Sequence, residues 1–496
     1  MKSTFKSACR SVIIFVLIFL IAAKAGSAQS KTQKIEEIDD YIHHVMSSFP
    51  INGMAIGIVE GDQVLYLQGY GTANQMGQPV TPQTPFMLAS LTKTFTALAM
   101  QQLADNGKLN LDEPVQTYIP EFRLNEVNSA SLITVRDLLN HTSGISTREG
   151  IEPYLYAENA VFEEVIAQLA KFQPEFPAGA QYEYSNWNYV LLGKIVERVS
   201  GEPYADYVQT HILDPLKMDH SSFEDYHAIE GSATGNLIVF GLSVPYDEKH
   251  RPLLASAGYL TSTAEDMTHY LLAYFDQARE GCEGLLCEKG LGWYDPTWNW
   301  YPGNPGDISY GYSGGHNSFN SAFQLFSLHQ VGVVVLMNTR LDTVTGGPSA
   351  SEIAFNIARI VIDFPYEIPS NRAFYFGYGM LVLLMISLLG SIIRQISTLP
   401  QWIVFARSVS PGVNLVKIGV GIIANLLVGA GILLYPFFTG ATWKTLLFHR
   451  LENSLPFFGA GILLVVIGLS KFCIQCAWLI RNSNPKFMKK PEFGKE

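Results

Sequence analysis

The stretch Met87-Leu88-Ala89-Ser90-Leu91-Thr92-Lys93-Thr94-Phe95-Thr96-Ala97-Leu98 organises the rest of this chain. It reads as the opening of a helix, because apolar residues recur at helical spacing from Phe95 and an Asn-Gly pair at 106–107 supplies a stop. Ser90 is expected at the N-terminal end, with Lys93 one turn later on the same face. A hydroxyl beside a lysine amine is the minimum for a serine nucleophile with a lysine base. The helix N-terminus would add N–H groups for a developing oxyanion.

The Ser-x-x-Lys pattern is weak evidence by itself. It also occurs at Ser3–Lys6 in the leader and at Ser483–Lys486 in the tail, where catalysis makes no sense. The alternative interpretation of Ser90–Lys93 is a helix cap followed by a solvated lysine. The rest of the chain has to decide between the two interpretations.

Composition excludes some function classes. The formal net charge is −11, yet the residues from Arg372 onward carry 12 Lys and Arg against 3 Asp and Glu. An acidic body with a basic, apolar tail is not the pattern of a nucleic-acid-binding protein. The 11 histidines show no His-Glu-x-x-His pair or similar ligand spacing, so we expect no metal and no cofactor.

The N-terminus resembles an export signal over residues 1–28. Lys2, Lys6 and Arg10 precede the apolar run Val12–Ala23, and small residues follow where a signal peptidase would cleave. An uncleaved anchor is the alternative, and it gives the same topology. Either way, the domain that follows is predicted to be exported.

Residues 370–496 are predicted as a membrane domain with three transmembrane helices. The apolar runs lie near 374–393, 418–437 and 455–472. Basic residues follow the first and the third run, and the positive-inside rule then places the C-terminus in the cytoplasm. The protein is therefore expected to be a multi-pass protein of the cell membrane. Asn425, inside the second run, is interpreted as a contact between helices rather than as a transport site.

Residues 29–369 predict one extracytoplasmic domain of the α/β class, of the α+β type. One hairpin, Gly53–Glu60 with Gln63–Gly71, lies near its start, and another, Phe319–Ser327 with Val331–Asn338, lies near its end. Helices are predicted between and after the hairpins, among them Asn188–Ser200, Ala264–Phe275 and Ser349–Ile362. Strands at both ends imply one antiparallel sheet assembled from both termini and flanked by helices.

Tyr184-Ser-Asn186 is the only Tyr-x-Asn sequence in this domain. A tyrosine facing a serine–lysine pair can pass a proton to and from the serine oxygen. An asparagine two residues later can orient the lysine or a substrate amide. The alternative interpretation is an aromatic core loop, because the chain contains 24 tyrosines.

A glycine-rich stretch precedes the second hairpin. Its centre, Tyr312-Ser313-Gly314-Gly315, suits an edge strand whose backbone must approach a ligand closely. A backbone N–H group in this strand could complete an oxyanion hole.

The order Ser-x-x-Lys, Tyr-x-Asn and glycine-rich edge strand resembles the serine β-lactamase and penicillin-binding-protein superfamily, in particular its class C-like, β-lactamase-related serine hydrolases. The resemblance covers roughly residues 35–365. Four further stretches resemble the family: Thr134–Gly144, Tyr184–Gly193, Ser256–Asp266 and Gly290–Trp293. An exported domain followed by membrane spans is similar to the membrane-anchored FmtA-like proteins of Gram-positive bacteria.

This resemblance implies a role for each motif residue. Ser90 would be the acylated nucleophile, Lys93 its base, and Tyr184 a group that relays the proton. Asn186 would position the substrate, and the N–H groups of Ser90 and Gly315 would bind the oxyanion. The implied reaction is a two-step acyl transfer without a metal, on a cell-wall component or a small ester; the oligomeric state stays open.

Tyr312 departs from the family pattern, in which the third motif begins with lysine or histidine. A lysine there would bind the carboxylate of a β-lactam or of a D-Ala-D-Ala peptide, whereas tyrosine offers a neutral hydroxyl. The substitution favours an esterase or penicillin-binding-like activity over a true β-lactamase. Tyr312, Ser313 and Gly314 are expected to contact the substrate together with Gly315.

Two other interpretations stay open. Gly311-Tyr-Ser313-Gly-Gly315 fits the nucleophile elbow of α/β-hydrolases, which requires a strand, a sharp turn and a helix. The domain could also be a catalytically impaired wall-binding or sensor module. His141, which follows a short predicted helix, is interpreted as a structural turn residue, and His316 as a residue near the site without a metal-ligand partner.

Overall fold

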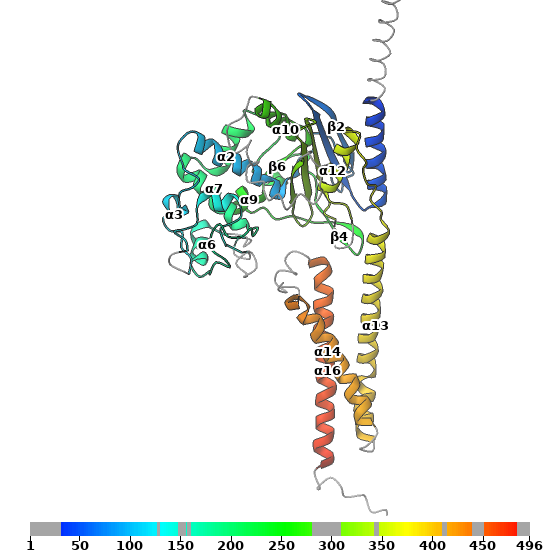
Figure 1. Cartoon of the computed structure of the whole chain (residues 1–496). Coiled ribbons are helices and arrows are strands. Elements are labelled where there is room, and N and C mark those ends of the chain that lie inside the picture. The colour runs from blue at the N-terminus through cyan, green and yellow to red at the C-terminus, as the bar shows by residue number, and fades with distance from the viewer. Residues whose placement is uncertain are drawn as a thin grey trace, which may run out of the picture. The chain divides into compact units, whose positions relative to one another are not determined.

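The computed structural model describes residues 31–125, 129–146, 155, 160–279, 309–341, 347–408, 414–438 and 451–483. The chain divides into two compact units, Met1–Ile238 with Ser243–Asn371 and Val239–Leu242 with Arg372–Glu496 (Figure 1). The predicted export signal over residues 1–28 and the motif Gly290–Trp293 lie outside the described residues.

A five-stranded antiparallel sheet forms the centre of the first unit. Its strands are β1 (Gly53–Glu60), β2 (Gln63–Gly71), β7 (Ser309–Gly315), β8 (Asn320–Phe326) and β9 (Val331–Met337), in the order β2-β1-β9-β8-β7. β1 pairs with β9, so the two hairpins predicted from the sequence join in the middle of the sheet. The prediction of one antiparallel sheet built from both ends of the domain is confirmed.

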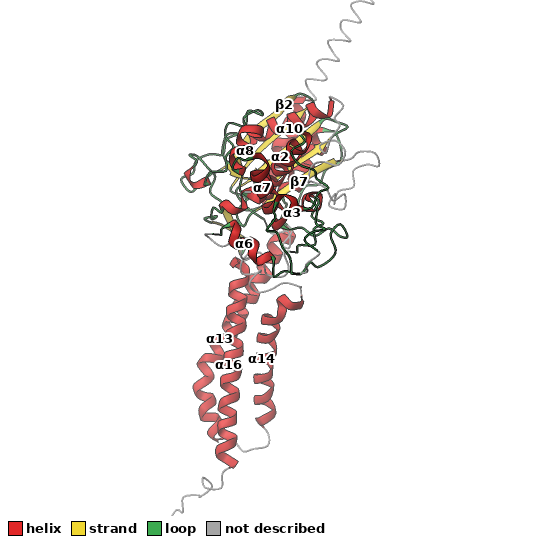
Figure 2. Cartoon of the chain, turned by 90° about the vertical axis from the view of Figure 1, so that its left-hand side faces the viewer, coloured by secondary structure: helices red, strands yellow, loops and turns green. Residues whose placement is uncertain are grey.

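Helices cover both faces of this sheet, as Figure 2 shows with helices in red and strands in yellow. They are α10 (Ala264–Arg279), α12 (Ala350–Val361) and the helix over residues 31–48. Gly57, opposite Val334, faces α10, because a Cβ added there would lie 2.5 Å from Thr268. Gln324, opposite Val333, donates a hydrogen bond to Ser351 of α12. Val333 and Val334 are consecutive, so α10 and α12 lie on opposite faces.

A mostly helical region lies between β2 and β7. Its elements are β3 (Phe86–Met87), η1 (Ala89–Thr92), α2 (Lys93–Asp105), α3 (Val115–Tyr118), α4 (Val135–Leu139), α6 (Phe162–Leu169), α7 (Asn186–Ser200), α8 (Tyr204–Val208), η2 (Gln209–Leu213), η3 (Tyr226–Ala228), β4 (Asn236–Val239), β5 (Leu242–Pro245), η4 (Pro252–Leu254), α9 (Ala255–Gly258) and β6 (Thr261–Ser262). α2 and α7 pack against each other in the core. The α-helix begins at Lys93 and not at Ser90, because Ala89 has a φ of 50° and the chain enters through a 3-10 turn.

The described residues of the second unit form three long helices, α13 (Arg372–Ser408), α14 (Asn414–Phe438) and α16 (Leu451–Ser483). Among the described residues, one helix, Arg372–Thr398, is long and apolar enough to cross a membrane, and two other apolar helices are shorter. Three transmembrane helices therefore stay a prediction. Asn425 donates to Gln395, and Lys471 donates to the same oxygen at 2.7 Å, which confirms Asn425 as a contact between helices.

Gly57→Ala tests the packing of α10 on the sheet. The added methyl group would press on Thr268 and on the backbone of Ala264, so we expect the free energy of unfolding to fall by about 1–3 kcal/mol. Chemical unfolding of the full-length protein in detergent measures this change. Gly379→Ala is the control, because a Cβ there meets nothing within 4 Å. Equal unfolding midpoints for the two variants would contradict the described packing.

Candidate active site

The backbone around Ser90 is held in an unusual conformation. β3 pairs with β6, and the N–H of Leu88 donates to the carbonyl of Leu260 at 2.8 Å. Ala89 then has a φ of 50°, in the left-handed region that costs a non-glycine residue about 1–2 kcal/mol. Ser321 donates to the carbonyl of Leu88 at 2.6 Å, so β8 helps to fix the turn. Ser90 stays partly exposed at this turn.

Lys93 is completely buried, and its ammonium group has three acceptors. It donates to the Oγ of Ser90 at 3.3 Å, to the Oδ1 of Asn186 at 2.8 Å and to the carbonyl of Ala257 at 2.5 Å. An ammonium carries three donors, so each donor has a partner. The alternative interpretation of a solvated lysine is therefore wrong.

Tyr184 lies on the other side of Ser90. Its hydroxyl is 2.7 Å from the Oγ of Ser90 and donates to the Oδ1 of Asn186 at 3.3 Å. The ammonium of Lys93 lies over its ring, 4.9 Å from the centroid. The structure thus brings together the four residues that the two motifs predicted, from chain segments more than 90 residues apart.

His141 supports the tyrosine loop, a contact that goes beyond the predicted turn role. Its Nδ1 accepts the N–H of Ser185 at 3.1 Å and lies 3.2 Å from the amide of Asn188. Its ring stacks on the ring of Tyr184, with the centroids 4.6 Å apart. Burial, together with the positive charge of Lys93, lowers the pKa of His141 well below its usual value. His141 is therefore neutral, and its ring packs against the ring of Tyr184 and supports it.

The glycine-rich strand β7 touches the Ser90 turn through Gly314. A Cβ added at Gly314 would lie 2.1 Å from the carbonyl oxygen of Leu88 and 2.9 Å from the nitrogen of Leu91. Only a glycine allows this approach between the two backbones. Gly314 is therefore required for a contact with the protein's own turn, while the approach of this strand to a ligand stays a prediction.

Gly315 is placed with its N–H toward the open side of β7. The N–H of His316 donates to the carbonyl of Phe319, so these two residues form a hydrogen-bonded pair. Along an antiparallel ladder, hydrogen-bonded pairs alternate with pairs that are not hydrogen-bonded. The next pair, Gly315 with Asn320, is therefore not hydrogen-bonded. The N–H of Gly315 therefore points away from β8, toward the free edge of the sheet.

Ser313 does not lie in a nucleophile elbow. β7 leads through a short turn into β8, a strand, where that motif requires a helix.

Tyr312, the residue before Ser313 in β7, is partly buried. Burial, reinforced by the nearby phenols of Tyr184, Tyr189 and Tyr182, raises the pKa of Tyr312 well above its usual value, so its hydroxyl stays neutral.

Three groups near the site were given no role by the sequence motifs, although two of them lie within the stretch Ser256–Asp266. The carbonyl of Ala257 accepts from Lys93, and the next carbonyl, that of Gly258, accepts from the ring of His316 at 2.7 Å. Arg340 follows β9 and donates to the carbonyl of His316 at 3.1 Å. Its guanidinium carbon would lie 3.4 Å from a Cβ added at Gly315. Arg340 therefore brings a positive charge to the end of β7.

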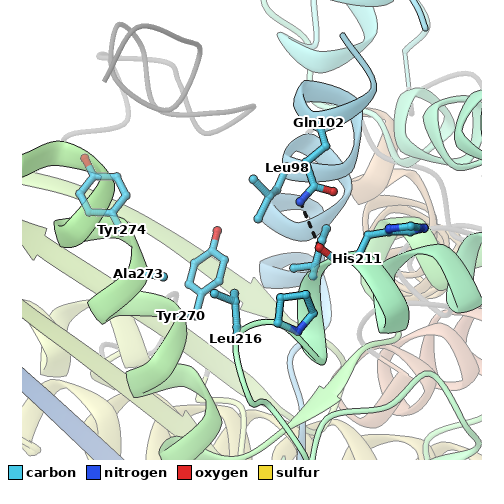
Figure 3. Close-up of a pocket in the computed structure, with 9 residues that line it drawn as sticks. Leu98, Gln102, His211, Leu216, Tyr270, Ala273 and Tyr274 are labelled. Atoms are coloured by element: carbon cyan, nitrogen blue, oxygen red, sulfur yellow. Dashed lines mark hydrogen bonds between the residues drawn. The ribbon is translucent and has the colours of Figure 1, made fainter. Parts of the chain in front are cut away.

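A small apolar pocket of about 200 Å³ lies away from these residues, between α2 and α10 (Figure 3). Leu98 and Gln102 line it, five and nine residues after Lys93, which places them on roughly the opposite side of α2. Within the described part of the chain, no group of three His, Cys, Asp or Glu side chains is arranged to hold a metal ion.

Gly314→Ala tests the contact between β7 and the Ser90 turn. The methyl group would displace the turn, and a shift of about 1 Å is expected to lower the reactivity of Ser90 about 10²-fold. The rate of labelling by a fluorophosphonate measures the effect. Gly311→Ala in the same strand is the matched control, because the atoms nearest to its methyl group belong to the side-chain amide of Gln324 and not to the Ser90 turn. Equal labelling of both variants would contradict this role of Gly314.

Comparisons with known proteins agree with this geometry. A family model described as Beta-lactamase matches residues 38–353. Protein flp of Staphylococcus aureus (strain MW2) is 27% identical over 321 residues, which are 62% of this chain and 64% of that protein. Teichoic acid D-alanine hydrolase of Staphylococcus aureus (strain MRSA252) is 31% identical over 197 residues, 40% of this chain and 46% of that protein. The chain thus spans less than two thirds of the length of each relative.

Solved structures show the same fold. The octameric penicillin-binding protein homologue from Pyrococcus abyssi matches with a TM-score of 0.57 and 27% identity, over 66% of this chain and 78% of that one. A class C beta-lactamase matches with a TM-score of 0.54 and 22% identity, over 67% and 96%. The family match covers more than half of the chain, and the chain therefore belongs to the Beta-lactamase family.

Proposed function

We propose that this protein is a membrane-anchored serine hydrolase that acts outside the cytoplasm, through an acyl-enzyme, on esters or peptides of the cell wall. The observation that supports this most is the contact set of Lys93, which is fully buried and hydrogen-bonded to both Ser90 and Asn186. A buried lysine next to a partly exposed serine is the arrangement that a lysine-activated nucleophile requires.

The lengths of the three Lys93 contacts suit a base. As a neutral amine, Lys93 retains two donors and gains a lone pair. The two shorter contacts go to the Oδ1 of Asn186 and to the carbonyl oxygen of Ala257. These oxygens can only accept hydrogen bonds, so they would keep the two N–H donors of the neutral amine. The longest contact, to the hydroxyl of Ser90, can reverse its direction, so the lone pair would receive the proton of Ser90.

Tyr184 provides a second path for this proton. Its hydroxyl touches Ser90 and donates to Asn186, the residue that also accepts from Lys93. As the tetrahedral intermediate collapses to the acyl-enzyme, the proton would pass through Tyr184 to the leaving group, whose bond to the acyl carbon breaks in this step. The N–H groups of Ser90 and Gly315 would bind the oxyanion, which fits the outward direction of the N–H of Gly315 derived above.

The substrate class follows from relatives and charge. One relative is named teichoic acid D-alanine hydrolase, which supports a D-alanyl ester as the acyl donor. Tyr312 is neutral, which weakens the case for β-lactamase activity, although Arg340 still offers a positive charge near Gly315.

The proposed location rests on the second unit. One apolar helix long enough to span a membrane supports anchoring, and three spans with an outer catalytic domain remain part of this proposal.

Ser90→Ala tests the nucleophile. We expect the full-length protein to gain one covalent adduct with a fluorophosphonate, with a fluorescent penicillin or with a D-alanyl ester, and Ser90→Ala to gain none. Intact-protein mass spectrometry identifies the adduct, and its mass names the acyl donor. Ser313→Ala should keep the adduct, even if substrate affinity changes. Folded protein without any adduct would instead favour the impaired wall-binding alternative.

Tyr184→Phe tests the proton path. Removing the hydroxyl that lies 2.7 Å from Ser90 is expected to slow acylation by about 10²-fold or more, because general acid–base catalysis contributes on that order. Labelling with the fluorophosphonate, quenched at a series of times, measures the rate of acylation. Tyr182→Phe, two residues earlier in the same loop, is the control and should retain the original rate. A Tyr184→Phe rate equal to that of the control would exclude the proposed relay.

A further inference from the structure

The hairpin of β4 and β5 is outside the candidate site and has a defined register. The N–H of Tyr246 donates to the carbonyl of Gly235 at 2.8 Å, which pairs these two residues at its base. Counting inward, Val239 lies opposite Leu242, and Phe240-Gly241 forms a two-residue turn. The tip of the hairpin therefore consists of residues 239–242.

One face of this hairpin is entirely aliphatic. Opposed residues share a face and alternate along each strand, so Leu237, Val239, Leu242 and Val244 lie on the same side. Leu242 is 70% exposed and Val244 is 41% exposed, while Ile238 on the other side is buried. An antiparallel hairpin of a soluble protein normally turns its polar face outward. This reversed pattern marks an interaction surface.

The turn adds an aromatic residue at an unfavourable position. Phe240 has a φ of 51° and Gly241 a φ of 84°, the combination of a type I′ turn. The first of these positions favours Asn, Asp or Gly, and a bulky side chain there is a true outlier. Because such strain is kept where function needs it, Phe240 indicates a role for the tip beyond folding.

The tip contacts the helix that is long enough to span a membrane. Residues 239–242 belong to the same compact unit as α13, and a Cβ added at Gly241 would lie 3.4 Å from Tyr378. The apolar helix Arg372–Thr398 has 27 residues. At 1.5 Å per residue it is about 40 Å long, the thickness of a bilayer with its headgroups. Tyr378, about 9 Å from the start of this helix, would lie near the boundary between headgroups and acyl chains.

We propose that the β4–β5 tip inserts into the boundary region of the lipid bilayer that α13 spans, as a second, interfacial anchor. This inference rests on the span in the proposed function. Two observations favour lipid over a protein partner. From Asn236 to Tyr246 the hairpin has no charged residue. The tip also contacts Tyr378, whose ring packs against Phe374, and Phe374 in turn packs against Tyr375; aromatic residues gather at membrane interfaces.

The test places an environment-sensitive fluorescent amino acid at one position at a time in the full-length protein, reconstituted in phosphatidylcholine and phosphatidylglycerol vesicles. Leu242 is the test position. Leu328, 71% exposed in the turn after β8, is the matched control in water, and Leu384, 54% exposed in α13, is the control within the span. Lipids with a quencher at shallow or deep positions report the depth of each probe.

The expected result is emission at Leu242 that shifts to shorter wavelength and falls about twofold or more with the shallow quencher, as for a group about 5–10 Å deep. Leu384 should respond to the deep quencher and Leu328 to neither. If Leu242 behaves like Leu328 while Leu384 is quenched, the anchor is overturned and the span stands. If Leu384 is also unquenched, the span and the anchor both fail. A shift at Leu242 without quenching, growing with protein density, would indicate a second copy and overturn the anchor.

Discussion

A fully buried ammonium group sets the arrangement of the candidate site. Moving a charged amine out of water costs several kcal/mol or more unless hydrogen bonds replace the lost hydration. Lys93 meets this requirement with acceptors from three elements, the Ser90 turn, the start of α7 and α9. None of these elements can move far without leaving a donor unpaired. The lysine therefore fixes the position of Ser90, the residue that it would activate in the proposed mechanism.

The backbone carries the second constraint. Ala89 enters the turn in the left-handed region, and Gly314 of β7 lies directly against the carbonyl of Leu88. A strained backbone conformation of this kind persists only where several independent contacts enforce it. Here these contacts come from two separate sheets, because β3 pairs with β6 just before the turn, while β7 and β8 follow the turn by more than 200 residues. The β7–β8 end of the five-stranded sheet is thus part of the frame that holds Ser90 in place.

The sequence predicted the features that depend on local pattern. Alternating apolar residues predicted the strands from Gly53 and Val331, and spacing predicted the pairing of Lys93 with Ser90. It could not predict that Ala257 accepts from Lys93, because a backbone carbonyl has no residue signature. It also missed the 3-10 turn at Ala89, since φ there is imposed by contacts with distant strands. The hairpin tip at Phe240 was missed because the sequence signal for a turn of this type is normally Asn or Asp at that position.

The surroundings of Lys93 also explain how one charge is kept in this cluster. The rings of Tyr184 and Tyr189 lie 4.9 and 5.4 Å from its ammonium, and aromatic faces attract a cation without using its donors. His141 lies against both rings, and a protonated imidazole there would repel Lys93. The lowered pKa of His141 prevents this, because burial and Lys93 both disfavour its charged form. A neutral His141 thus leaves Lys93 as the cation that the two rings attract, held by its contacts with Ser90, Asn186 and Ala257.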